Sequence, residues 1–100
     1  MAAERYLTDE RTSIEVYGGG TRVEGTLRNL SATGAKIVYN NEAPAFLKIG
    51  DLIQMTVHLP AINKSHKLSA EVVWKNADGT GVSFLTAETL YQRFVDRTNS

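Results

Sequence analysis

The chain has 100 residues, no cysteine, and 11 basic against 11 acidic residues, so its formal net charge is zero. The lack of cysteine excludes disulfides and thiolate chemistry, and the balanced charge argues against a protein that holds long nucleic acid on a basic face. With 42% hydrophobic residues but no apolar run near the roughly 20 residues of a membrane-spanning helix, we expect one globular, cytoplasmic domain without membrane insertion.

The first ten residues show no apolar periodicity, so we expect a flexible arm over residues 1–10 and a single domain over residues 11–100. Apolar and polar residues then alternate, which predicts one strand around Ile14 and Val16 and a second over residues 22–28. Three glycines at 18–20 separate the two strands and favour a turn, because glycine readily adopts positive φ. A third strand is expected over residues 35–39.

The later part of the chain predicts three more strands and a helix. Alternation marks residues 52–59, 67–75 and 82–84, and Asp78 followed by glycine favours a tight hairpin between the last two strands. At Thr86 the period becomes that of an amphipathic helix, which we expect over residues 86–97. About six antiparallel strands followed by one helix predict a mainly β fold, a six-stranded antiparallel β-barrel with a C-terminal α-helix.

The residue types of catalytic sites do not come together in this sequence. His58 and His66 have no nearby His, Asp or Glu at the spacing of metal ligands. Ser31 lacks the strand-to-helix turn that presents a hydrolase nucleophile. We therefore expect a protein that is not an enzyme, with no catalytic residue, metal or cofactor.

Residues 29–34 have the form (Asp/Asn)-x-Ser-x-x-Gly and follow the second expected strand. Short polar side chains at the end of a strand can hydrogen-bond a ligand held against the outside of a barrel, or they can form a local turn. Upstream, Arg5 and Arg11 can bind phosphate and guanine edges through their guanidinium groups, or they can be solvated surface charges.

The order and spacing of several segments resemble PilZ domains, the bacterial receptor modules for cyclic di-GMP. The segments are residues 29–35, 49–53, 57–60, 70–74 and 81–84. The resemblance implies a six-stranded barrel with a C-terminal helix, and a ligand site built from an Arg-x-x-x-Arg motif in the arm and the (Asp/Asn)-x-Ser-x-x-Gly motif. Carried over to this sequence, it implies that cyclic di-GMP is bound by Arg5, Arg11, Asn29, Ser31 and Gly34.

The arm departs from the family's arginine motif. If Arg11 is the second arginine, Leu7 stands where the first should be, and Arg5 lies two residues too early. Asp9 and Glu10 also add negative charge beside a ligand with two phosphates. Losing one charged hydrogen-bonding partner costs about 1.5–3 kcal/mol, roughly ten- to a hundredfold in affinity.

Two functions follow, and both stay open at this point. The first is a single-domain effector that binds cyclic di-GMP and relays the signal to a protein partner in motility, pilus or surface-behaviour regulation. The alternative, favoured by Leu7, is a PilZ-like adaptor that binds a protein partner but no nucleotide. A third idea, a barrel for single-stranded nucleic acid, needs outward aromatic side chains. The alternation places Trp74 inward with Met55 and Phe84, so we expect Trp74 to pack in the core.

Overall fold

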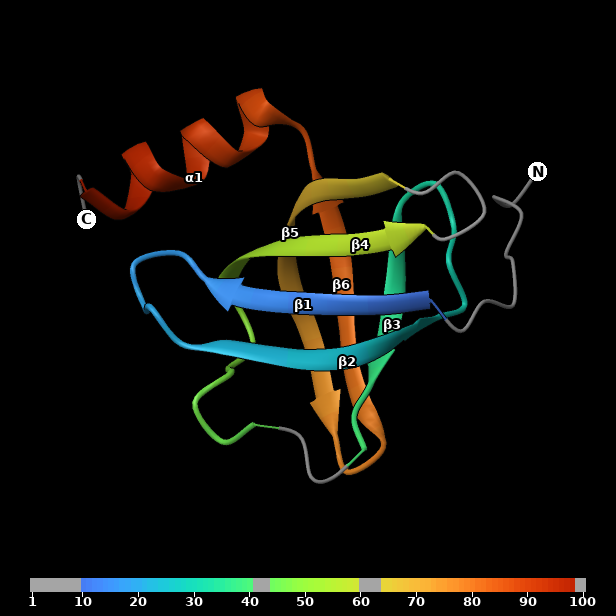
Figure 1. The fold of residues 1–100 in the computed structure, drawn as a ribbon. Helices are drawn as coiled ribbons and strands as arrows, with labels where there is room; N and C mark the ends of the chain where they lie inside the picture. Colours follow the sequence, from blue (N-terminus) through green and yellow to red (C-terminus); the bar gives the residue numbers. More distant parts are fainter. Residues whose placement is uncertain (1–9, 41–43, 60–63, 99–100) are drawn as a thin grey trace.

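Six strands and one helix follow one another along the chain in the computed structural model, which describes residues 10–40, 44–59 and 64–98 (Figure 1). The strands are β1 (Glu10–Val16), β2 (Arg22–Arg28), β3 (Gly34–Val38), β4 (Leu52–Leu59), β5 (Lys64–Asn76) and β6 (Gly79–Leu85), and the helix is α1 (Ala87–Thr98). All paired strands are antiparallel, and the order β1-β2-β3-β6-β5-β4 closes into a barrel. The expected six-stranded barrel with a C-terminal helix is therefore confirmed.

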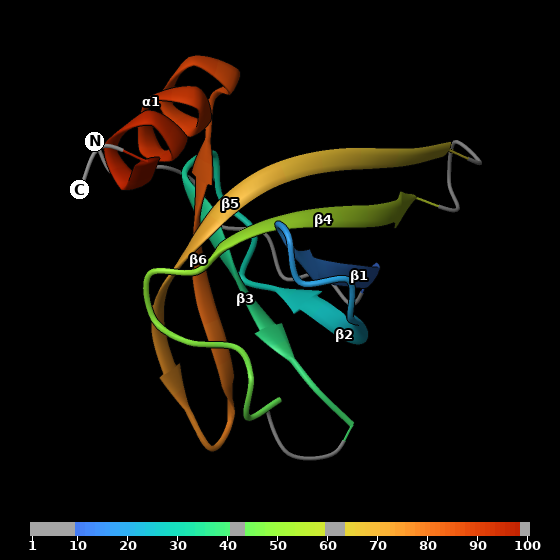
Figure 2. The same ribbon diagram turned by 90° about the vertical axis from the view of Figure 1, so that its left-hand side faces the viewer.

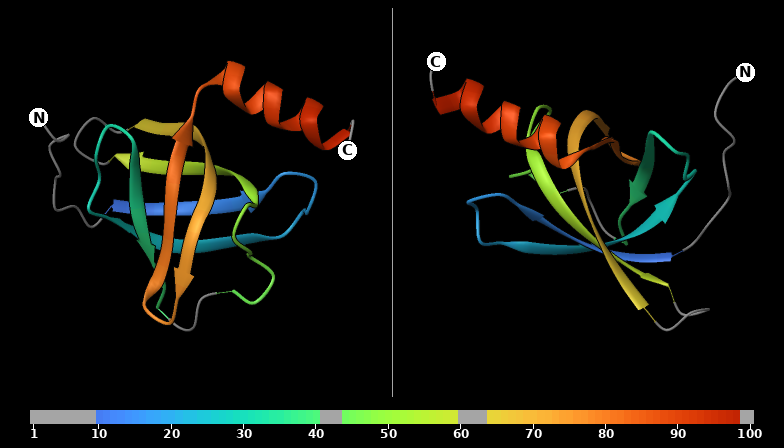
Figure 3. Two further views of the ribbon diagram at one scale, coloured as in Figure 1. Left: turned by 180° about the vertical axis from the view of Figure 1, so that it is seen from behind. Right: turned by 90° about the horizontal axis from the view of Figure 1, so that it is seen from above.

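The 13-residue strand β5 belongs to both walls of the barrel. Its first half pairs with β4, and its second half pairs with β6 from Ser69 onward. One wall thus consists of β2, β1, β4 and the first half of β5. The other wall consists of β3, β6 and the second half of β5, which lie side by side in the left view of Figure 3. Figure 2 shows the far end of the β4–β5 hairpin projecting beyond the rest of the barrel.

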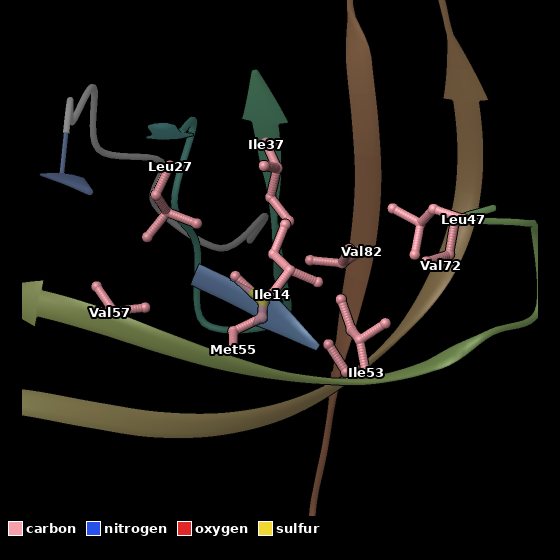
Figure 4. Packing of buried hydrophobic residues seen from close by; sticks show 10 residues of the cluster. Ile14, Leu27, Ile37, Leu47, Ile53, Met55, Val57, Val72 and Val82 are labelled. Atoms are coloured by element: carbon pink, nitrogen blue, oxygen red, sulfur yellow. The ribbon is translucent and has the colours of Figure 1, made fainter. Parts of the chain in front are cut away.

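Apolar side chains from all six strands fill the barrel (Figure 4). The alternation in β4 is reproduced, since Ile53, Met55 and Val57 are buried while the polar residues between them face outward. Leu47, from the loop before β4, is also buried and belongs to the same core cluster as Val72.

The loop that carries Leu47 is fastened to the barrel by a lysine. Lys75 Nζ donates hydrogen bonds to the carbonyl oxygens of Pro44 at 2.7 Å and Leu47 at 2.8 Å. Because Lys75 is half-buried, these bonds are shielded from water and hold the loop against β5.

A β-bulge in β5 changes the side on which Trp74 lies. Val72 pairs with Val82, but Trp74 pairs with Gly81, so Val73 is an extra residue in the ladder. An inserted residue reverses the inward and outward phase of the residues that follow it. Trp74 is accordingly 39% exposed, and the prediction that it packs in the core is wrong. In the sequence of β5, Val73 is the only sign of the bulge, since it is an apolar residue where the alternation expects a polar one.

The helix α1 begins just after Thr86, whose Oγ1 accepts a hydrogen bond from the backbone N–H of Thr89 at 3.1 Å. This bond satisfies one of the donors that a helix leaves free in its first turn. The ring of Phe94 meets that of Tyr17 edge-on, with centroids 5.4 Å apart, so the helix is attached beside the β1–β2 turn. None of the helical structure in the described part of the chain is long and apolar enough to cross a membrane.

Candidate functional site

A hollow of about 260 Å³ lies on the outer wall formed by β3, β6 and the second half of β5. Three of the site residues expected from the sequence, Asn29, Ser31 and Gly34, line it together. Lys36 and Trp74 line the same hollow. Hydrogen-bonding groups, a cation and an aromatic surface therefore meet at one place on the barrel.

The loop between β2 and β3 is shaped by Asn29 and Ser31. Asn29 has a φ of 51°, in the left-handed region that asparagine tolerates better than most residues. Ser31 Oγ accepts hydrogen bonds from the backbone N–H groups of Thr33 and Gly34, each at 3.2 Å, and is within 3.2 Å of the Gly34 carbonyl oxygen, to which it donates. The Ser31 hydroxyl therefore orders the loop, which is the local-turn role that the sequence left open.

Gly34 is required by the close approach of two strands. A Cβ at this position would overlap the carbonyl oxygen of Val82 on β6. Because Gly34 pairs with Ser83, a side chain here would push β3 away from β6 and open the outer wall. The glycine of the motif thus keeps the floor of the hollow intact.

Trp74 is a candidate site residue that sequence reasoning missed. Its indole lies over Gly81, where a Cβ would overlap the ring. Lys36 Nζ is 6.0 Å from the centre of the Trp74 ring, at the outer limit of a cation–π contact. Gly81 is the residue in the sequence that could have indicated this position of Trp74, since a glycine inside a strand often marks a bulge or a close approach of another chain segment.

The structure separates Arg11 from this hollow. Arg11 pairs with Thr26 and lines a second hollow of about 320 Å³ on the wall of β1, β2 and β4, together with Glu24 and His58. Arg5 lies outside the described residues, as does Leu7.

Two other cations lie at or next to the first hollow. Lys36 lines it, and Arg28, which immediately precedes Asn29, pairs with Lys36 across β2 and β3. They supply positive charge at the hollow, whereas the sequence predicted positive charge at the ligand site only from Arg5 and Arg11.

Elsewhere in the barrel, burial raises the pKa of Tyr39, whose hydroxyl donates to Thr80 Oγ1 at 2.9 Å. Thr80 is fully buried, so this pair is an internal polar contact. Within the described residues, no group of three or more His, Cys, Asp or Glu is arranged to hold a metal ion.

Comparisons with known proteins agree with this architecture. A model of the PilZ domain family matches residues 2–97. The fold is similar to the crystal structure of the PilZ domain of CeSA from a cellulose-synthesizing bacterium, with a TM-score of 0.66 and 21% sequence identity over 91% of this chain and 88% of that one. No curated protein sequence matches. Because the family model spans nearly all of its residues, the chain belongs to the PilZ domain family.

Proposed function

We propose that this protein is a PilZ-type adaptor that binds cyclic di-GMP in the hollow beside Asn29 and relays the signal to a protein partner. The observation that carries the proposal is the meeting of Asn29, Gly34, Lys36 and Trp74 around one hollow on the outer wall. Membership of a family of cyclic di-GMP receptors supports the choice of ligand. We also propose that the protein acts in the cytoplasm, in the regulation of motility, pili or surface behaviour.

Each group around the hollow matches one part of a cyclic dinucleotide. A purine base can stack on the exposed Trp74 ring, which is worth about 1–3 kcal/mol per base. The amide of Asn29 can hydrogen-bond a guanine edge, and Lys36 with Arg28 can neutralise a phosphate. The hollow has a volume of about 260 Å³, while pockets for drug-sized ligands start near 300 Å³. It therefore holds part of the nucleotide and leaves the rest to be covered.

We assign the cover of the rest of the nucleotide to the N-terminal arm. Glu10 pairs with Leu27, two residues before Asn29, so the chain enters β1 beside the loop that borders the hollow. Arg5 precedes Glu10 by five residues, a length that spans at most about 17 Å when extended. We assign Arg5 to a phosphate of the ligand. Arg11, on the other wall, contributes its charge at longer range.

Calorimetric titration with cyclic di-GMP, with cyclic di-AMP as a control, tests the proposal. We expect saturable binding of cyclic di-GMP alone. Trp74 is the single tryptophan of the chain, so base stacking will also change the intrinsic fluorescence. A flat calorimetric trace together with unchanged fluorescence at high cyclic di-GMP concentration would reject nucleotide binding.

A second candidate function is an adaptor that binds a protein partner and no nucleotide. It is favoured by Ser31, whose hydroxyl is engaged within its own loop, and by Arg11, which lies on the other wall. This candidate predicts a folded barrel with no response to either cyclic dinucleotide, and specific binding to a protein partner that Trp74→Ala does not weaken.

A further inference from the structure

The first five residues of β5, 64–68, form a sheet edge that is free on one side within the described structure. They pair with β4, but the pairing of β5 with β6 begins only at Ser69. Ser65, His66 and Lys67 are exposed, and Figure 2 shows this end of the hairpin projecting from the barrel. An edge of this kind presents unpaired backbone N–H and C=O groups to which another extended segment can add as a strand.

The projecting hairpin carries positive charge and no negative charge. Residues 52–70 include Lys64, Lys67 and two histidines, but no Asp or Glu. Lys67 pairs with Thr56 on β4, and the next strand of this wall, β1, carries Arg11. The acidic residues of this wall, Glu10, Glu15 and Glu24, lie on β1 and β2, and β4 separates these strands from the β5 edge. A ligand at the β5 edge therefore meets an electropositive strand.

Charge decides which kind of chain fits this edge. A second copy pairing through the same strand would bring two basic strands together, with an exposed Lys67 on each, which disfavours self-association. Nucleic acid requires a broader basic surface than two lysines in a chain of zero net charge. An extended acidic segment can hydrogen-bond the unpaired backbone groups of the β5 edge, and its carboxylates can also pair with the positive charge there.

We propose that the edge of β5 at residues 64–68 is a docking site for an extended, acidic segment of a partner protein, which adds to the sheet as an extra strand. The site is independent of the nucleotide hollow, because Lys67 does not line that hollow. It gives the adaptor a surface for its partner on a different wall from the one that carries Trp74.

The test uses the full chain, isotope-labelled for NMR, and a synthetic peptide of alternating Glu and Val as the probe. We expect amide shift changes at residues 65–68 and along β4, with slower amide exchange at the edge. Lys67→Glu should weaken peptide binding by about tenfold, since attraction is replaced by repulsion. Lys48→Glu, an exposed lysine on the loop before β4, makes the same change in net charge and should leave binding within twofold of the unaltered chain.

Several outcomes would overturn the proposal. One is the absence of shifts at residues 65–68 with millimolar peptide, and another is an equal loss of binding in both variants, which would show attraction by net charge alone. A matching response to a peptide of alternating Lys and Val, or to a short oligonucleotide, would also contradict it. Shifts at this edge that depend on protein concentration without peptide would assign it to a second copy. The fluorescence response to cyclic di-GMP is a separate readout that Lys67→Glu leaves unchanged.

Discussion

The indole ring of Trp74 lies on the backbone of Gly81, in the space that any side chain at that position would occupy. The bulge at Val73 turns the tryptophan outward, and the missing Cβ of Gly81 lets the ring settle against β6 at the edge of the hollow. Because of these two residues, from neighbouring strands, a tryptophan that the periodicity predicts to be in the core instead lines the hollow on the outer wall.

Gly81→Ala should displace the Trp74 ring and destabilise the barrel by about 1–3 kcal/mol, because the added methyl has no room. Chemical denaturation measures the loss of stability, and the emission wavelength of the single tryptophan reports the movement of the ring. Unchanged emission would contradict the packing of the indole on Gly81.

Trp74→Ala should weaken cyclic di-GMP binding by about 5- to 150-fold, the equivalent of one lost base stack. Val73→Ala is the matched control, since Val73 is adjacent and 47% exposed but does not line the hollow. Calorimetry should show a large loss for the tryptophan variant alone. Equal losses of cyclic di-GMP affinity in both variants would contradict the stacking of a base on Trp74.

Arg5→Ala should weaken cyclic di-GMP binding by roughly ten- to a hundredfold, through loss of a charged hydrogen bond to phosphate. Arg11→Ala should have a much smaller effect, because Arg11 lines the hollow on the other wall. Calorimetric titration of the two variants side by side compares them. A larger loss for Arg11 would contradict the assignment of the phosphate contact to Arg5.

Lys75→Met should destabilise the protein by about 2 kcal/mol, because it removes a charged donor from two carbonyl oxygens in a half-buried loop. Lys48→Met, at an exposed position on the same loop, should stay within about 0.5 kcal/mol of the unaltered chain. Urea denaturation of both variants provides the measurement. If the two variants lose equal stability, Lys75 does not hold the loop.

The pH dependence of stability at high pH should include a contribution from Tyr39. Burial raises the pKa of this residue in the folded state, so the folded chain keeps the hydroxyl proton at a pH where the unfolded chain has lost it. This contribution is fully present below the ordinary tyrosine pKa of about 10 and is lost as the pH rises above it.

Tyr39→Phe should therefore flatten part of the decline in stability above pH 10. It should also cost about 1 kcal/mol at neutral pH through the lost hydrogen bond to Thr80. Tyr91→Phe is the control, since Tyr91 is 69% exposed. Unfolding free energies measured by denaturant from pH 8 to 11 distinguish the two, and identical pH profiles would rule out the buried hydroxyl as a contributor.

Local sequence patterns predicted much of the fold. Alternation over residues 52–59 identified β4 and its buried face, because side chains in a strand point alternately to the two sides. Thr86 marked the start of the helix for a similarly local reason, because its hydroxyl accepts a hydrogen bond from the backbone N–H of Thr89 in the first turn. The motif at 29–34 predicted a loop with short polar side chains after a strand, and this loop borders the hollow.

Tertiary structure alone decided how the site is composed. The bulge that exposes Trp74 exists only in the register between β5 and β6, and Lys36 joins the hollow because β3 pairs with β6 across more than 40 residues of sequence. Arg11 faces the other wall because β1 pairs with both β2 and β4. Periodicity reports which side of its own strand a residue occupies, whereas strand pairing determines which distant residues share a wall of the barrel.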